Sequence, residues 1–233
     1  MEQSYALLEA AVSCGSPTRG TELAYDALVQ AGLPGLLGGA ACYPMEKLAP
    51  CPHHPPHLRH LDTVMAVSRA LRANLLTALE RGQYPVVIGG DHSIAMGSLA
   101  ALGEFYGAEN LAVVYIDAHA DINTEQTSVT GCIHGMDLAA ACGLCCDALT
   151  VGRQKVNLLG RNLYILGGRR STASWPPRGP TCTPRRSWPG TDWAGCWPIF
   201  SPGWRTSGFT SALTWTAWIP ASFPPPAICS PTA

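Results

Sequence analysis

The sequence is poor in charge, and the charges it has are balanced. Only 13% of the 233 residues are charged, and the formal net charge is −1. A nucleic-acid-binding surface or an acidic tail needs an excess of one sign, so neither is expected. No apolar run reaches the roughly 18 residues that a membrane-spanning helix needs. We therefore expect no nucleic-acid partner and no membrane segment.

The N-terminal segment MEQSYALLEAAVSCG lacks the basic start and apolar core of a signal peptide. The ten cysteines are therefore expected to be cytosolic thiols rather than a disulfide framework, in a cytoplasmic protein. Two cysteine clusters are weak metal candidates. Residues 142–146 (CGLCC) resemble half of a zinc ribbon without its matching half, so incidental or buried thiols are favoured there. The other cluster lies in a proline-rich loop and consists of Cys51, His53, His54, His57 and His60.

The composition changes abruptly near Arg170. Residues 170–233 contain no histidine, valine, lysine or glutamate, yet they hold all seven tryptophans and 12 of the 20 prolines. Prolines interrupt any helix, and no helical or strand period survives in this segment. We therefore expect two parts: an α/β domain over residues 1–169, and a disordered Pro- and Trp-rich tail over residues 170–233.

The first part alternates between strand-like and helix-like segments. Residues 5–12 form a short apolar run, and residues 22–31 and 61–79 have helical spacing. Continuously apolar runs, typical of strands buried on both faces, are PVVI (85–88), LAVVYI (111–116) and NLYIL (162–166). Ser93 is expected to cap a helix that extends to Leu102. This alternation predicts an α/β fold with a mainly parallel sheet covered on both faces.

Two polar motifs follow strands of this predicted sheet. Residues 89–93 (GGDHS) come after the strand ending at Ile88, and residues 117–121 (DAHAD) come after the strand ending at Ile116. Ligands of such sheets bind at the carboxyl ends of strands. A lone histidine there is usually a hydrogen-bonded structural residue, but three carboxylates and two imidazoles are costly to bring together unless a cation balances them. The mixed oxygen and nitrogen ligands suit Mn²⁺ or another first-row divalent ion.

The motifs together resemble those of the arginases, within the ureohydrolase family of binuclear manganese enzymes. The resemblance covers residues 5–169 and includes GGDHS, DAHAD, the following Ile122-Asn123-Thr124, and residues 131–135 (GCIHG). Residues 20–23 (GTEL) are similar to the N-terminal segment of the family. The resemblance implies a three-layer α/β/α sandwich, here incomplete at its C-terminal side.

The resemblance also implies a role for each matching residue. His92 would bind one manganese ion and His119 the other, Asp117 would bridge the two, and Asp121 would complete the first ion's ligands on this side. Two bound ions lower the pKa of a water molecule and orient it toward the guanidinium carbon. His134 would pass a proton to the leaving amine, because imidazole titrates near neutral pH.

Substrate contacts are implied in the same way. Asn123 and Thr130 match residues that hold the α-carboxylate and α-amino end of the substrate, and His134 lies on the same side. The Ile-Asn-Thr sequence is the arginase version of this loop, which favours L-arginine as substrate and L-ornithine and urea as products. Cys132 departs from the asparagine usual in the family. Members commonly form homo-oligomers.

Half of the expected metal ligands are missing. The family supplies a later Asp-x-Asp at another strand end and a downstream Glu that pairs with the guanidinium. This sequence has no Asp after Asp192 and no Glu after Glu125. We therefore expect the chain to be impaired or inactive.

The genetic code suggests how the motif was lost. Tryptophan is always encoded by TGG, so reading from the third base of each codon turns Trp215-Thr216 into GAC and Trp218-Ile219 into GAT, both Asp. With permitted codons elsewhere, residues 208–221 then read LHVSFDLDCLDPS, which resembles the missing Asp-x-Asp strand. We infer the loss of one nucleotide near the codons for Arg169 and Arg170, which makes residues 170–233 an out-of-frame tail.

Other interpretations stay open at this point. The chain can be an agmatinase-like enzyme or another guanidino or formimino hydrolase, because these enzymes share the metal ligands. It can also be a non-catalytic fragment. A third interpretation is an interaction protein that uses the Trp-rich tail, which would then have to fold on a partner.

Overall fold

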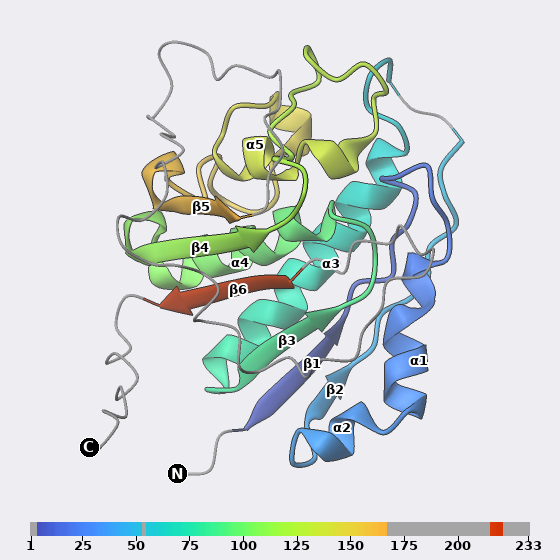
Figure 1. Cartoon of the computed structure of the whole chain (residues 1–233), viewed down its shortest axis with the longest axis vertical. Helices are drawn as coiled ribbons and strands as arrows, with labels where there is room; N and C mark the ends of the chain where they lie inside the picture. The colour runs from blue at the N-terminus through green and yellow to red at the C-terminus, as the bar shows by residue number, and fades with distance from the viewer. Residues whose placement is uncertain (1–3, 53–54, 167–214, 221–233) are drawn as a thin grey trace, which may run out of the picture.

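The computed structural model describes residues 4–52, 55–166 and 215–220. The strands are β1 (Tyr5–Glu9), β2 (Ala41–Tyr43), β3 (Tyr84–Ile88), β4 (Leu111–Ile116), β5 (Leu163–Leu166) and β6 (Trp215–Pro220). The α-helices are α1 (Ala24–Gln30), α2 (Leu33–Leu36), α3 (Leu61–Glu80), α4 (Ile94–Tyr106) and α5 (Asp137–Ala141). Strands and helices alternate along the chain as the sequence predicts (Figure 1).

The strands form two three-stranded sheets, in the orders β2-β1-β3 and β5-β4-β6. The pairs β1–β2, β1–β3 and β4–β5 are parallel. The prediction of an α/β fold with a mainly parallel sheet is therefore confirmed. β6 is the exception, because it runs antiparallel to β4, with Trp215 beside Ile116 and Pro220 beside Leu111.

Helices α3 and α4 lie behind the strands in Figure 1 and supply much of the core. Leu71, Leu75, Leu99 and Leu102 are fully buried or nearly so, and they belong to the same core cluster as Leu8 of β1. Burying one such side chain contributes about 1.5–3 kcal/mol relative to leaving it exposed. The packing of these helices against the strands, in addition to the β-propensity of the strand residues, holds the two sheets in place.

A glycine lets α3 and α4 approach closely. A Cβ atom at Gly97 of α4 would lie 2.5 Å from the backbone oxygen of Ser68 in α3. Real Cβ atoms do not come this close to a carbonyl oxygen, so any larger residue would push the helices apart. The close crossing holds the start of α4, and with it the GGDHS segment, against the rest of the domain.

The predicted capping role of Ser93 is wrong in detail. Ser93 does directly precede α4, but its side chain makes no capping hydrogen bond. Its hydroxyl instead donates to Oδ1 of Asp91 at 2.5 Å, and the same oxygen accepts the Ser93 backbone N–H at 3.0 Å. Asp91 therefore organises the turn, because a carboxylate accepts two hydrogen bonds where a hydroxyl would offer one.

Most of the predicted tail lies outside the described residues. Within it, residues 215–220 are described as β6, and the proposal that residues 170–233 are disordered stays a prediction.

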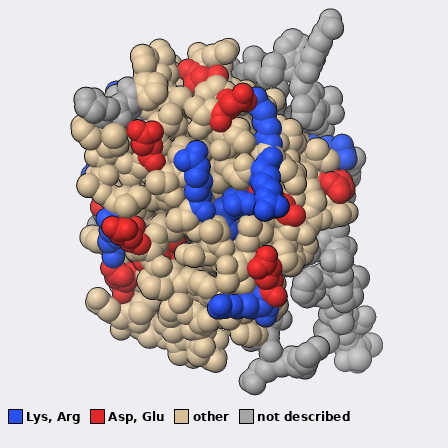
Figure 2. Space-filling view, turned by 180° about the vertical axis from the view of Figure 1, so that it is seen from behind, with Lys and Arg blue, Asp and Glu red and all other residues tan. Residues whose placement is uncertain are grey.

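The surface carries few charges on the face seen in Figure 2, and both signs are interspersed there. Among the described residues, no helix is both long enough and apolar enough to cross a membrane.

Candidate metal centre

Two loops at neighbouring strand ends build the site. Gly89 and Gly90 follow β3 with φ of 96° and 78°, in the left-handed region that favours glycine. A Cβ atom at Gly90 would lie 2.5 Å from the backbone oxygen of Ala10, so the chain passes the end of β1 only because this side chain is absent. The doublet thereby delivers Asp91 and His92 to the edge of the sheet where β4 ends.

The second loop turns back on itself directly after β4. Asp121 has a φ of 45°, a strained value for a residue with a side chain. Its backbone oxygen accepts the N–H of Leu138 at 3.2 Å, which fixes the turn against α5. This conformation brings the Asp121 carboxylate back toward Asp117.

His92, Asp117 and Asp121 form a compact buried cluster. His92 Nδ1 lies 2.8 Å from Oδ2 of Asp117 and 2.8 Å from Oδ2 of Asp121. The ligand atoms of all three residues lie within 4.8 Å of one another, and they form a group that could hold a metal ion in the described part of the chain. Asp117 and Asp121 are only 5% and 8% exposed.

The cluster fits a divalent cation on its own chemistry. Oδ2 of Asp117 is buried, and His92 Nδ1 lies 2.8 Å from it. Burial lowers the pKa of His92, but the nearby carboxylates of Asp121 and Asp117 outweigh it and raise the pKa. The protein thus concentrates negative charge and leaves one imidazole to balance it. A cation between these oxygens and Nδ1 would complete that balance.

His119 does not join the compact cluster. Its Nδ1 lies 3.4 Å from Oδ1 of Asp117, its backbone N–H donates to the same oxygen at 3.0 Å, and its side chain is 75% exposed. It therefore stands on the solvent side of Asp117, away from His92. Its predicted role as a ligand of a second ion stays a prediction.

The predicted substrate residues follow the DAHAD segment: Asn123 and Thr130 lie in loops, and His134 lies in a short 3₁₀-helix (Ile133–Gly135). The N–H of Asn123 donates to the backbone oxygen of Gly135 at 3.0 Å, which ties its loop to the turn that carries His134. His134 is partly buried, and its backbone N–H donates to Gly15 at 3.1 Å. Thr130 is exposed, and its hydroxyl accepts the N–H of Cys132 at 3.2 Å. Their contacts with a substrate stay predictions.

Two further polar residues at the site were missed by the sequence reasoning. The hydroxyl of Tyr115 lies 2.9 Å from both His92 Nδ1 and Asp121 Oδ2, and 3.3 Å from Oδ2 of Asp137. Asp137 is completely buried at the start of α5. Tyr115 precedes Asp117 by two residues, the spacing that puts side chains on one face of a strand. This two-residue spacing was the sequence pattern that could have identified Tyr115 as part of the site.

The cysteine clusters do not form metal groups in the described part of the chain. Cys142 and Cys145 are buried, and burial raises the pKa of Cys145 to about 12. His60 Nδ1 contacts the backbone oxygen of Cys51 at 2.8 Å. His53 and His54 lie outside the described residues.

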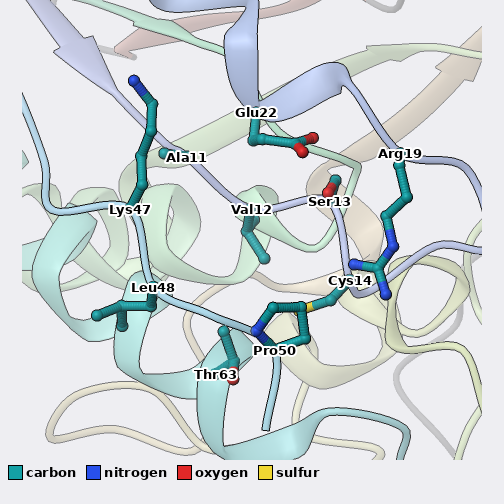
Figure 3. A pocket seen from close by; sticks show the side chains of 10 residues that line it. All are labelled: Ala11, Val12, Ser13, Cys14, Arg19, Glu22, Lys47, Leu48, Pro50 and Thr63. Atoms are coloured by element: carbon teal, nitrogen blue, oxygen red, sulfur yellow. The ribbon is translucent and has the colours of Figure 1, made fainter.

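A separate cavity of about 360 Å³ opens beyond the end of β1 (Figure 3). Its lining includes the side chains of Ser13, Cys14, Arg19, Glu22 and Lys47. None of the residues lining this cavity belongs to the metal cluster. The cavity combines both charge signs, whereas the metal cluster concentrates carboxylates.

Comparisons with known proteins agree with this geometry. The model of the arginase family matches residues 3–173. The chain is 32% identical over 182 residues to the arginase of Bacillus subtilis (strain 168), covering 72% of this chain and 58% of that protein. It is 42% identical over 113 residues to the arginase of Bacillus caldovelox, covering 48% of this chain and 37% of that protein.

The fold is similar as well. A crystal structure of arginase from Bacillus subtilis superposes with a TM-score of 0.62 at 30% identity, over 72% of this chain and 58% of that one. The chain thus spans less than two thirds of the length of these relatives. With the family model matching most of its residues, the chain belongs to the arginase family.

Proposed function

We propose that this chain descends from a manganese-dependent arginase that hydrolyses L-arginine to L-ornithine and urea. The observation that carries the proposal is the buried His92–Asp117–Asp121 group at two strand ends, in a member of the arginase family. His92, Asp117 and Asp121 would hold one ion, and Asp117 and His119 would hold part of a second. When bound, the metal supplies an activated water for attack on the guanidinium carbon.

The other residues of the site have separate tasks. His134 would hand a proton to the leaving amine nitrogen as general acid. Asn123 and Thr130 would hold the α-carboxylate and α-amino group, which orients the guanidinium toward the metal cluster. Agmatine lacks the α-carboxylate, so this contact decides between arginine and agmatine.

We also propose that the present chain is impaired. No Asp-x-Asp follows residue 173, where the family match ends, close to the inferred break at Arg169 and Arg170. β6 lies beside β4 but runs antiparallel to it, so its carboxyl end at Pro220 lies beside Leu111, at the edge opposite Asp117. A parallel strand would present its last residues at the metal edge. The chain therefore supplies one half of a binuclear site.

The direct test compares two proteins: the present chain, and a frame-restored chain with one nucleotide inserted near codon 169. Both are incubated with Mn²⁺ and either L-arginine or agmatine, and urea release is measured. We expect urea from the restored chain with arginine, and at least a hundredfold less from the present chain. Rapid urea release by the present chain would refute the impairment.

Sequencing the coding DNA tests the frame inference separately. The first Asp of the restored motif requires a Leu213 codon that ends in G. Another base there would contradict the inferred strand, and so would a stop codon soon afterwards in the shifted frame. Preference of the restored chain for agmatine over arginine would overturn the substrate assignment while leaving the metal site intact.

A further inference from the structure

Tyr115 stands behind the metal cluster and contacts two of its three members. The side chain is 1% exposed, and its ring meets the His92 ring edge-on with centroids 5.9 Å apart. Its hydroxyl lies 2.9 Å from both His92 Nδ1 and Asp121 Oδ2. These are the two atoms that would face the cation from β3 and from the turn after β4.

Asp137 holds the hydroxyl from the opposite side. Its Oδ2 lies 3.3 Å from the Tyr115 oxygen, and its Oδ1 accepts the backbone N–H of Leu138 at 2.8 Å. The carboxyl group is completely buried, and this burial, followed by the nearby charge of Asp121, raises its pKa well above the ordinary value. Asp137 thus contacts the Tyr115 hydroxyl from a completely buried position, fixed by its bond to the Leu138 N–H.

The single proton of the Tyr115 hydroxyl can be donated in only one hydrogen bond at a time. The phenol has one proton and three neighbouring polar atoms. A cation bound to His92 Nδ1 uses the lone pair of that nitrogen, so the phenolic proton then belongs to Asp121. The geometry agrees, because the hydroxyl lies 2.9 Å from Asp121 Oδ2 and 3.3 Å from Asp137 Oδ2, so Asp121 is the nearer acceptor.

We propose that Tyr115 is a positioning residue of the metal centre, whose hydroxyl, held by Asp137, orients the Asp121 carboxylate and the His92 imidazole toward the ion. Partners behind the direct ligands fix ligand orientation, and their loss commonly costs 10- to 100-fold in metal affinity. The positive φ of Asp121 turns its carboxylate toward the cluster, where the Tyr115 hydroxyl meets it. The inference rests on the metal site of the proposed function.

Tyr25 shows what a tyrosine with a purely structural role looks like in this chain. It is also buried, at 4% exposure, but its hydroxyl reaches the backbone oxygen of Leu7 at 3.5 Å. It is therefore the matched control, because Tyr25→Phe removes a buried hydroxyl that does not touch the metal cluster.

The experiment measures Mn²⁺ binding to the full chain by electron paramagnetic resonance of the free ion, and unfolding of each metal-free variant by urea. We expect Tyr115→Phe to weaken Mn²⁺ binding about tenfold, and Tyr25→Phe to leave it unchanged. Asp137→Asn keeps a polar partner for the Tyr115 hydroxyl and an acceptor for the Leu138 N–H, so it should bind Mn²⁺ nearly as the unaltered chain does. Asp137→Leu removes both and should weaken binding as Tyr115→Phe does.

The outcomes separate the two proposals. If the unaltered chain binds Mn²⁺ and Tyr115→Phe binds it equally well, the positioning role is overturned and the metal site stands. Equal weakening by Tyr25→Phe, or weakening by Asp137→Asn as severe as by Asp137→Leu, would also overturn it. Absence of Mn²⁺ binding by the folded, unaltered chain would overturn the metal site, and the positioning role with it.

Discussion

One partly buried carboxylate between two helices and several buried aspartates at the strand ends are balanced in opposite ways in this protein. Between α3 and α4, Glu104 is held by both Arg72 Nε, at 2.8 Å, and Arg72 Nη2, and it also accepts the N–H of Arg153 at 2.9 Å. These hydrogen bonds outweigh the effect of burial and lower the pKa of Glu104. At the ends of β3 and β4, the ion-pair partners of the aspartates in the described part of the chain are imidazoles.

This difference indicates that a cation would bind at the strand-end aspartates and not at the helix contact. A carboxylate that meets a guanidinium is satisfied within the chain, and it stabilises the contact between two helices. The aspartates at the ends of β3 and β4 meet imidazoles and hydroxyl groups but no guanidinium among the described residues, and burial raises the pKa of Asp91 and Asp137. Such an arrangement costs stability without a cation, which is a feature of binding sites rather than of helix contacts.

The largest effect is expected when a charge is removed from the metal cluster. Asp117→Asn keeps the size of the side chain but removes the charge of a direct ligand. Mn²⁺ affinity should fall on the order of 100-fold or more, since even partners behind the ligands cost 10- to 100-fold. Isothermal titration of the purified chain measures this. Stability of the metal-free chain should not fall, because a buried like charge is removed.

Asp147→Asn is the matched control for that change. Asp147 is an exposed carboxylate that pairs with Lys155 at 2.6 Å, outside the metal cluster. Its Mn²⁺ affinity should equal that of the unaltered chain. Equal losses in both variants would indicate nonspecific binding of the ion to surface acids.

A smaller effect is expected at the helix contact. Glu104→Gln removes the charge that holds Arg72, and should lower the free energy of unfolding by about 2 kcal/mol, the scale of a hydrogen-bonded ion pair. Urea denaturation with and without Mn²⁺ measures it. Mn²⁺ affinity should stay the same, and a change in affinity would show that the two groups are coupled through α4.

The smallest expected effect is the pH dependence of the metal-free chain. The aspartates with raised pKa bind protons that the unfolded chain releases above the ordinary value of 3.8, so their contribution falls as pH rises from there. The contribution of protonated His92 is complete below 6.5 and is lost as pH rises through its raised pKa. Glu104 acts in the opposite sense, losing its contribution as pH falls below 4.5.

Stability of the metal-free chain should therefore decline from mildly acidic toward alkaline pH. The additional stability conferred by Mn²⁺ should grow over the same range, because the ligands bind metal in their deprotonated forms. Thermal unfolding between pH 5 and 9, with and without Mn²⁺, tests both slopes. The Asp137→Asn variant should show a shallower metal-free slope, and an unchanged slope would contradict the raised pKa of Asp137.

The local pattern of the sequence was enough to place several elements. The continuous apolar run 111–116 became β4 with the predicted bounds, and the helical stripe of residues 61–79 became α3 within one residue. Both segments are long or strongly periodic, so the pattern of apolar side chains within each one predicts its burial. Ser93 takes the predicted N-cap position of α4, but its hydroxyl makes no capping hydrogen bond, because it donates to the Asp91 carboxylate in the folded turn.

The sequence by itself determined the α/β fold, because the apolar runs that form buried strands are local. It also determined the two motifs that follow strands and contain Asp91, His92, Asp117 and Asp121, because ligand-binding residues gather at strand ends in such folds. Only the tertiary structure decided which of these atoms meet. It joined His92 with two aspartates, left His119 exposed, and placed Tyr115 and Asp137 behind the cluster. Those contacts join residues 6 to 29 positions apart, and the turns and helix packing that create them are not encoded in any single segment.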